Sequence, residues 1–166
     1  MVKASITSIS VVALMVLLAA CGSSDTKTAT ASGPSKADYI AEVDASCKVA
    51  NATVETSTAE VTGEITKGDF VAAAATTQKI LETQQASLDA VKALPRPSGS
   101  DAELNAIFAA QDKTFVAVAA FIEVIKGGNI SEILAGSQKA LPLQSAAEEL
   151  AKKFGFKSCA VTATDG

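Results

Sequence analysis

The sequence predicts an all-α protein, an antiparallel four-helix bundle with a kinked last helix and one disulfide. Three observations predict this fold. Apolar residues recur at alternating spacings of three and four along four long segments. Short runs of glycine, proline and N-capping residues separate these segments. Two cysteines, Cys47 and Cys159, lie in the first helical segment and just after the last. Helices of similar length joined by short turns favour up-down-up-down packing.

The first element is an export signal, predicted over residues 1–20. A charged start at Lys3 precedes an apolar run that extends from Val11 to Ala20. This run is too short for a comfortable membrane span and is typical of a secretory signal. The four residues Leu18-Ala19-Ala20-Cys21 resemble the lipobox of bacterial lipoproteins, whose cysteine is acylated and becomes the new N-terminus. An ordinary secreted protein with a chance cysteine is the alternative.

The lipobox resemblance implies that the thiol of Cys21 is the lipidation site and carries a diacylglycerol. Two or three acyl chains anchor a protein stably, so the membrane is an expected partner. The localisation that follows is extracytoplasmic, with the chain lipid-anchored to the bacterial cell membrane. Residues 21–35 are the anchor and a small, polar, flexible tether with a reach of about 20 Å. Residues 36–166 are the helical domain, long enough for one core.

The first two helices are bounded by caps and breakers. Ser35 with Asp38 resembles a capping box, and the apolar stripe behind it stops at Lys67-Gly68. Gly68 suits the left-handed position after a helix, and Asp69 can cap the next one. We expect that second helix over Phe70–Leu94, because Pro95-Arg96-Pro97 cannot continue it.

The third and fourth helices are bounded by the same kinds of capping and helix-breaking residues. Ser100-Asp101-Ala102-Glu103 repeats the capping signature, and Gly127-Gly128 ends the most apolar stripe of the chain. Asn129 is the predicted cap of the fourth helix, which runs to Phe154. Pro142 lies inside that helix and is expected to kink or split it near Leu141.

The three cysteines are assigned by compartment and by geometry. Acylation of Cys21 leaves Cys47 and Cys159, and an exported chain meets an oxidising compartment. Counting down the bundle places Cys47 about 7 to 8 Å above the level of Phe154. A left-handed turn at Gly155 can bring Cys159 back up to it, so a Cys47–Cys159 disulfide is predicted. A free, redox-active cysteine pair is the competing interpretation.

The helical domain as a whole resembles a family, and three stretches carry the resemblance. Three stretches, residues 37–51, Leu94-Pro95-Arg96-Pro97 and residues 154–159, are similar to small exported helical lipoproteins of actinobacteria. The resemblance supports the fold and the disulfide. It implies no activity, since most members of that family are uncharacterised.

Composition excludes much chemistry. Histidine is absent, which removes Ser-His-Asp and Cys-His catalysis and the histidine-bearing zinc and di-iron sites. The net charge of −4, more negative by one once Lys3 leaves with the signal, does not favour nucleic acid. Two carboxylate pairs, Glu60 with Glu64 and Glu148 with Glu149, are the only local clusters, and they are typical of a solvated surface. The sequence therefore predicts no enzyme, no cofactor and no metal site.

Two functions remain after these exclusions. The leading prediction is a non-catalytic binding or interaction module of the cell envelope, whose partner is an envelope protein. The alternative is a carrier of a small apolar ligand inside the bundle, near Pro142. Four aromatic residues would line its pocket, although rings at helical spacing more often fill a core: Phe70, Phe108, Phe115 and Phe121.

Overall fold

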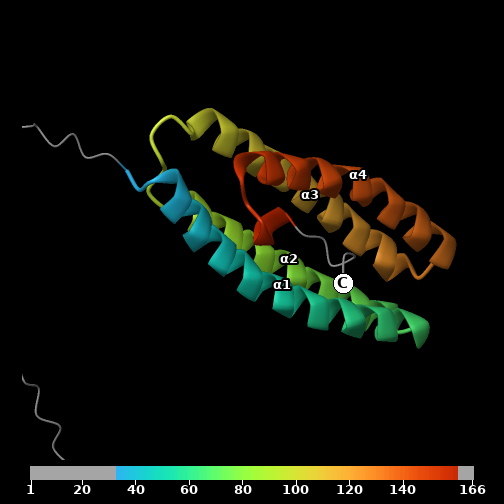
Figure 1. Cartoon of the computed structure of the whole chain (residues 1–166). Coiled ribbons are helices and arrows are strands. Elements are labelled where there is room, and N and C mark those ends of the chain that lie inside the picture. Colours follow the sequence, from blue (N-terminus) through green and yellow to red (C-terminus); the bar gives the residue numbers. More distant parts are fainter. Residues whose placement is uncertain (1–32, 161–166) are drawn as a thin grey trace, which may run out of the picture. The chain divides into compact units, whose positions relative to one another are not determined.

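The structure is a computed structural model that describes residues 33–160 (Figure 1). The described residues all belong to one compact unit of the chain. The predicted signal over residues 1–20, the lipidation site Cys21 and most of the tether lie outside the described residues. The same is true of residues 161–166.

Four long helices make up the described part. They are α1 (Lys36–Thr66), α2 (Phe70–Lys92), α3 (Asp101–Gly127) and α4 (Ile130–Phe154), and a short 3-10 helix, η1 (Ser158–Ala160), follows. Residues 33–160 contain no strand. Each long helix packs against the next one along the chain, α1 on α2, α2 on α3 and α3 on α4 (Figure 1). The predicted all-α bundle is confirmed.

The helices begin and end at the predicted capping and helix-breaking residues, with one difference in the capping contacts. The side chains of Ser35, Asp69 and Asn129 each accept a hydrogen bond from a backbone N–H in the first turn of the next helix. Ser100 also precedes a helix, but its side chain makes no capping hydrogen bond. It occupies the predicted N-cap position and its carbonyl oxygen accepts from Leu104, but its side chain is buried at 5 % exposure and does not form the predicted cap.

The helix interfaces enclose two apolar clusters. One gathers the start of α1, the end of α4 and the segment after it, and includes Tyr39, Leu104, Phe108, Phe154 and Phe156. The other lies toward the α1–α2 and α3–α4 turns, and includes Ala73, Leu81, Phe115, Ile122 and Ile133. The half-buried side chain of Leu88 packs against both clusters and connects them.

The backbones of the first and last helices do not approach each other closely, although side chains at their ends are in contact, such as Tyr39 and Phe154. No Cα atom of α1 lies within 8 Å of a Cα atom of α4. The helix η1 packs against both of them instead, and Figure 1 shows it between α1 and α4. The segment that follows α4 therefore bridges the two helices that a four-helix bundle ordinarily pairs directly.

Pro142 does not split the last helix. Helix α4 is continuous from Ile130 to Phe154, so the predicted break near Leu141 is wrong. Both Leu141 and Pro142 are exposed. A proline removes one backbone donor, and on the exposed side of a helix the unpaired carbonyl can bond to water, which bends a helix without ending it.

Candidate functional site

The most elaborate arrangement of polar groups surrounds the disulfide. Cys47 of α1 and Cys159 of η1 form a disulfide with an S–S distance of 2.06 Å, and they lie 112 positions apart in sequence. Their Cα atoms are 5.1 Å apart. The predicted pairing is confirmed, and the left-handed turn at Gly155, with φ of 116°, returns the chain toward α1 as expected.

One carboxylate holds the backbone of the returning segment. Asp44 accepts hydrogen bonds from the backbone N–H groups of Lys157, Ser158 and Cys159, over distances of 2.8 to 3.3 Å. These three N–H groups open a 3-10 turn and have no partner within it, so a side chain from α1 caps η1. We call residues 155–160 the strap.

A second polar side chain holds the strap from about two turns further along α1. The amide nitrogen Nδ2 of Asn51 donates a hydrogen bond of 2.7 Å to the backbone oxygen of Ser158. Asp44, Cys47 and Asn51 are spaced by three and then four residues, which places them on one face of the helix. We call these three residues the clamp.

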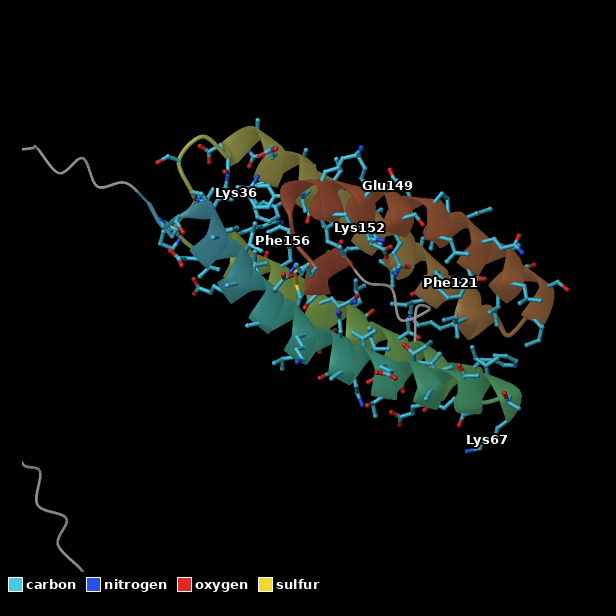
Figure 2. All side chains as sticks on the ribbon, viewed as in Figure 1. Lys36, Lys67, Phe121, Glu149, Lys152 and Phe156 are labelled. Atoms are coloured by element: carbon cyan, nitrogen blue, oxygen red, sulfur yellow. A yellow bond between two sulfur atoms is a disulfide. The ribbon has the colours of Figure 1, made fainter. Side chains whose placement is uncertain are left out.

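Aromatic packing holds the beginning of the strap. Phe156 is 4 % exposed, and its ring centroid lies 4.9 Å from that of Phe154 and 6.3 Å from that of Tyr39. Figure 2 shows Phe156 on the inner side of the strap, beneath the end of α4. The ammonium group of Lys36 lies 4.0 Å from the centre of the Phe154 ring and covers this cluster.

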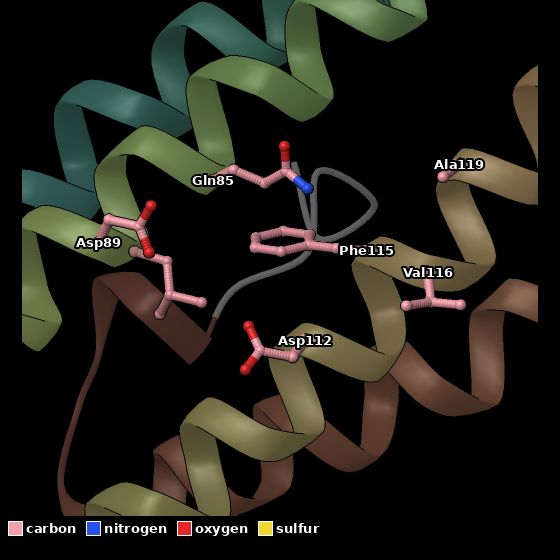
Figure 3. A pocket seen from close by; sticks show the side chains of 7 residues that line it. Gln85, Asp89, Asp112, Phe115, Val116 and Ala119 are labelled. Atoms are coloured by element: carbon pink, nitrogen blue, oxygen red, sulfur yellow. The ribbon is translucent and has the colours of Figure 1, made fainter.

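The four phenylalanines of the predicted ligand pocket do not line one cavity. Phe108 belongs to the apolar cluster at the strap, and Phe115 belongs to the other cluster. Phe70 packs beside Gly128, and Phe121 packs on Gly136. Two of the rings line separate open grooves, Phe115 between α2 and α3 (Figure 3) and Phe121 between α3 and α4.

The two grooves differ in character. The α2–α3 groove, of about 380 Å³, has the carboxylates of Asp89 and Asp112 at its edge (Figure 3). Asp112 forms a salt bridge there with the ammonium group of Lys92, at 3.0 Å. The α3–α4 groove, of about 480 Å³, is lined mostly by apolar side chains, with Glu132 and Lys139 on its α4 side.

The carboxylates of the pairs singled out by the sequence lie in different surroundings. Oε1 of Glu64 accepts a hydrogen bond of 3.2 Å from Thr76, while its Oε2 is buried without a partner. Glu60 and Glu149 are exposed. Within the described range, no group of three or more potential metal ligands comes together.

Sequence reasoning missed two of the three clamp residues. Asp44 and Asn51 look like ordinary solvated side chains, because nothing in their own neighbourhood marks a partner more than a hundred residues away. The available signal was their spacing around Cys47. Once that cysteine was paired with Cys159, polar side chains one turn to either side were the groups nearest the strap.

Comparison with known proteins adds no further assignment. No protein-family model matches the chain, and no curated protein and no solved structure is detectably similar to it. Among the helices that the structure describes, none combines the length and the apolar character needed to cross a membrane.

Proposed function

We propose that the chain is a lipid-anchored, extracytoplasmic module that binds a protein partner of the cell envelope and performs no catalysis. The observation that carries the proposal is the disulfide, which joins residues 112 positions apart in a chain that opens with a lipobox-like signal. Structural disulfides persist in oxidising compartments outside the cytoplasm. The lipobox resemblance at Cys21 adds the anchor.

Exposed apolar side chains on α4 support binding. Ile130, Leu134 and Leu141 are 49 %, 60 % and 52 % exposed. Their spacings of four and seven residues place them along one side of the helix. A row of apolar side chains on one face is a surface on which a protein partner gains by removing them from water.

Membrane fractionation with intact mass spectrometry tests the anchor. We expect the wild-type chain in the membrane fraction, cleaved before Cys21, heavier by a diacylglycerol and lighter by two hydrogens for the disulfide. The control is Cys21→Ser, which should lose the added mass and leave the membrane fraction. A wild-type chain that keeps residues 1–20 or carries an unmodified Cys21 would contradict the anchor.

Site-specific photo-cross-linking in living cells tests the binding surface. A photoreactive amino acid at Leu134 or Leu141 should give discrete cross-linked bands with envelope proteins. The matched control is the same amino acid at Val71, which is 75 % exposed but lies on α2. Equal cross-linking from all three positions would argue against a partner-specific face on α4.

The apolar α3–α4 groove favours a second candidate, the carrier of a small apolar ligand. Its volume of about 480 Å³ falls within the range of about 300–1,000 Å³ that small-molecule sites occupy. Native mass spectrometry of protein extracted in mild detergent would detect such a ligand as an extra mass. Ala140→Trp, which fills the groove, should abolish that mass, whereas Val71→Trp should retain it.

A further inference from the structure

The strap is held by two sets of interactions that do not depend on one another. The disulfide is the covalent one. The second set is non-covalent, and it comprises the three N–H groups on Asp44, the bond from Asn51 to Ser158, and the buried ring of Phe156. No contact of the second set involves a sulfur atom.

The position of the sulfur atoms adds to this arrangement. Cys47 and Cys159 are both half-buried, so neither is sealed inside the core. The Sγ atom of Cys159 lies 3.6 Å from the carbonyl oxygen of Val43. On reduction the two sulfur atoms must move apart, and a Cys159 thiol that stays near this position has an acceptor for its hydrogen.

We propose that the clamp makes Cys47–Cys159 a reversible redox latch, in which Asp44 keeps the reduced strap docked with its two thiols adjacent. The disulfide then opens and closes on a folded protein. Its reaction partner is a dithiol, the chemical class that performs thiol–disulfide exchange outside the cytoplasm. The proposal does not rest on the binding function proposed above.

The exchange balances without any further reagent. One thiolate of the dithiol attacks a sulfur of the pair, the S–S bond breaks, and a mixed disulfide forms. The second thiolate of the dithiol displaces the remaining cysteine. Two electrons and two protons have then passed to the protein, which carries thiols at Cys47 and Cys159, and the dithiol has become a disulfide. An oxidised partner reverses each step.

Asp44 is a positioning residue in this scheme, and its variants separate the latch from a structural disulfide. Asp44→Ala removes every acceptor that it offers to the strap. Asp44→Asn retains Oδ1, the oxygen that accepts from all three N–H groups, and should rescue most of the effect. Glu55→Ala, which removes an exposed carboxylate of the same helix, is the matched control.

The test is hydrogen exchange of the strap amides before and after reduction of the full chain with dithiothreitol. In the oxidised state wild type, Glu55→Ala and Asp44→Asn should protect the amides of Lys157, Ser158 and Cys159. Asp44→Ala leaves those three amides without an acceptor, so the docked strap is compared among all four proteins at the amide of Ala160, which donates to the carbonyl oxygen of Lys157. After reduction, wild type, Glu55→Ala and Asp44→Asn should retain protection. In reduced Asp44→Ala the Ala160 amide should exchange at least about tenfold faster than in reduced wild type, the change expected when a hydrogen bond to a charged acceptor no longer holds the strap, whereas in the oxidised proteins it should exchange at the same rate.

Reoxidation with oxidised glutathione provides a second readout. Reduced wild type should re-form the Cys47–Cys159 bond as a monomer, at least about tenfold faster than Asp44→Ala. Equal exchange, or equal reoxidation rates, in those two proteins would overturn the proposal. Loss of protection throughout α2 and α3 of the reduced wild type would also overturn it, because the chain would then need its disulfide to fold.

Discussion

Tyr39 is a core residue that carries a buried polar group without a hydrogen-bond partner. It is 0 % exposed and packs against Phe154 and Phe156, yet its hydroxyl has no hydrogen-bond partner. Buried hydroxyl groups ordinarily have one, because an unpaired group has lost its bonds to water without replacement. The ring therefore stabilises this end of the bundle while its oxygen opposes that gain.

Removing the hydroxyl should stabilise the protein. For Tyr39→Phe we expect a free energy of unfolding about 1 kcal/mol higher, since the ring contacts remain and the unpaired group is gone. Urea unfolding at pH 7, followed by far-ultraviolet circular dichroism, measures the change. A loss of 1 kcal/mol or more would show that the hydroxyl has a partner in solution.

The same residue predicts how stability depends on alkaline pH. Burial raises the pKa of the Tyr39 phenol above its ordinary value of 10.0, Arg96 lowers it, and Glu42 raises it. Above pH 10 the unfolded chain releases this proton while the folded chain retains it, so the unfolded state binds fewer protons and stability falls as pH rises. Below pH 10 both states keep the proton, so the contribution of the neutral phenol to stability is fully present.

Two measurements check this linkage. Tyr39 is the only tyrosine and the chain has no tryptophan, so the absorbance of phenolate near 295 nm reports on one group. Its midpoint in the folded protein should lie above 10.0. Between pH 9 and pH 11, wild type should lose more stability than Tyr39→Phe, and this difference isolates the phenol from lysines that titrate in the same range. Parallel losses would contradict the prediction.

At the scale of single elements, two helical glycines make a matched pair. A Cβ atom built on Gly136 of α4 would lie 2.8 Å from Cδ2 of Phe121 on α3, whereas one built on Gly63 of α1 would meet nothing within 4 Å. Both helices gain from alanine by roughly 0.5–1 kcal/mol in the absence of a clash. Only Gly136 lets its helix approach its neighbour this closely.

We therefore expect opposite signs from the two substitutions. Gly63→Ala should raise the free energy of unfolding by about 0.5–1 kcal/mol. Gly136→Ala should lower it by about 1–2 kcal/mol, because the Phe121 ring must move out of a packed interface. Chemical denaturation of both variants, with the double variant as a test of additivity, measures the contrast. A stabilising Gly136→Ala would show that the ring relocates at little cost.

Pro142 gives the second prediction for an element. The residue is exposed and lies inside a continuous helix, so its ring contributes no core packing and removes one backbone hydrogen bond. Pro142→Ala should raise the thermal midpoint and stabilise the protein by about 1–3 kcal/mol. A destabilised variant would indicate that the bend at Pro142 fits α4 to the surface of α3.

For the whole molecule, the sequence predicts where the helices begin and end better than it predicts how the first and last helices are joined. The second helix was expected over residues 70–94 and is observed over Phe70–Lys92, because Asp69 and Pro95 act locally and leave little freedom. The predicted fourth helix, to Phe154, ends where expected, since only a left-handed residue such as Gly155 suits the position after it. Local chemistry decides such boundaries.

The features that could not be predicted depend on contacts between distant segments. Apolar periodicity shows that α1 and α4 each have a buried face, but not that a strap separates them. Nothing in the sequence around Asp44 indicates that it accepts hydrogen bonds from three backbone N–H groups, because those groups lie more than a hundred residues away. Pro142 was expected to kink or split its helix, and the helix is not split, because packing of α4 against α3 outweighs the local cost.

Loss of the disulfide is the prediction that concerns the entire chain. A cross-link between residues 112 positions apart restricts the unfolded chain and contributes about 4–5 kcal/mol on the chain-entropy account. Domains of this size have total stabilities of about 5–15 kcal/mol. The double variant Cys47→Ser/Cys159→Ser should therefore remain folded at 25 °C but lose up to that amount, and its unfolding should depend more steeply on urea, because the unfolded state expands.

The urea slope separates two origins of that loss. If the cross-link acts on the unfolded chain, the slope rises and the strap amides of the folded double variant stay protected by Asp44. If it acts on the folded state, the slope stays the same and those amides exchange freely. Equilibrium urea unfolding and hydrogen exchange on one sample distinguish the two, and we expect the first, because the clamp holds the strap without help from the sulfur atoms.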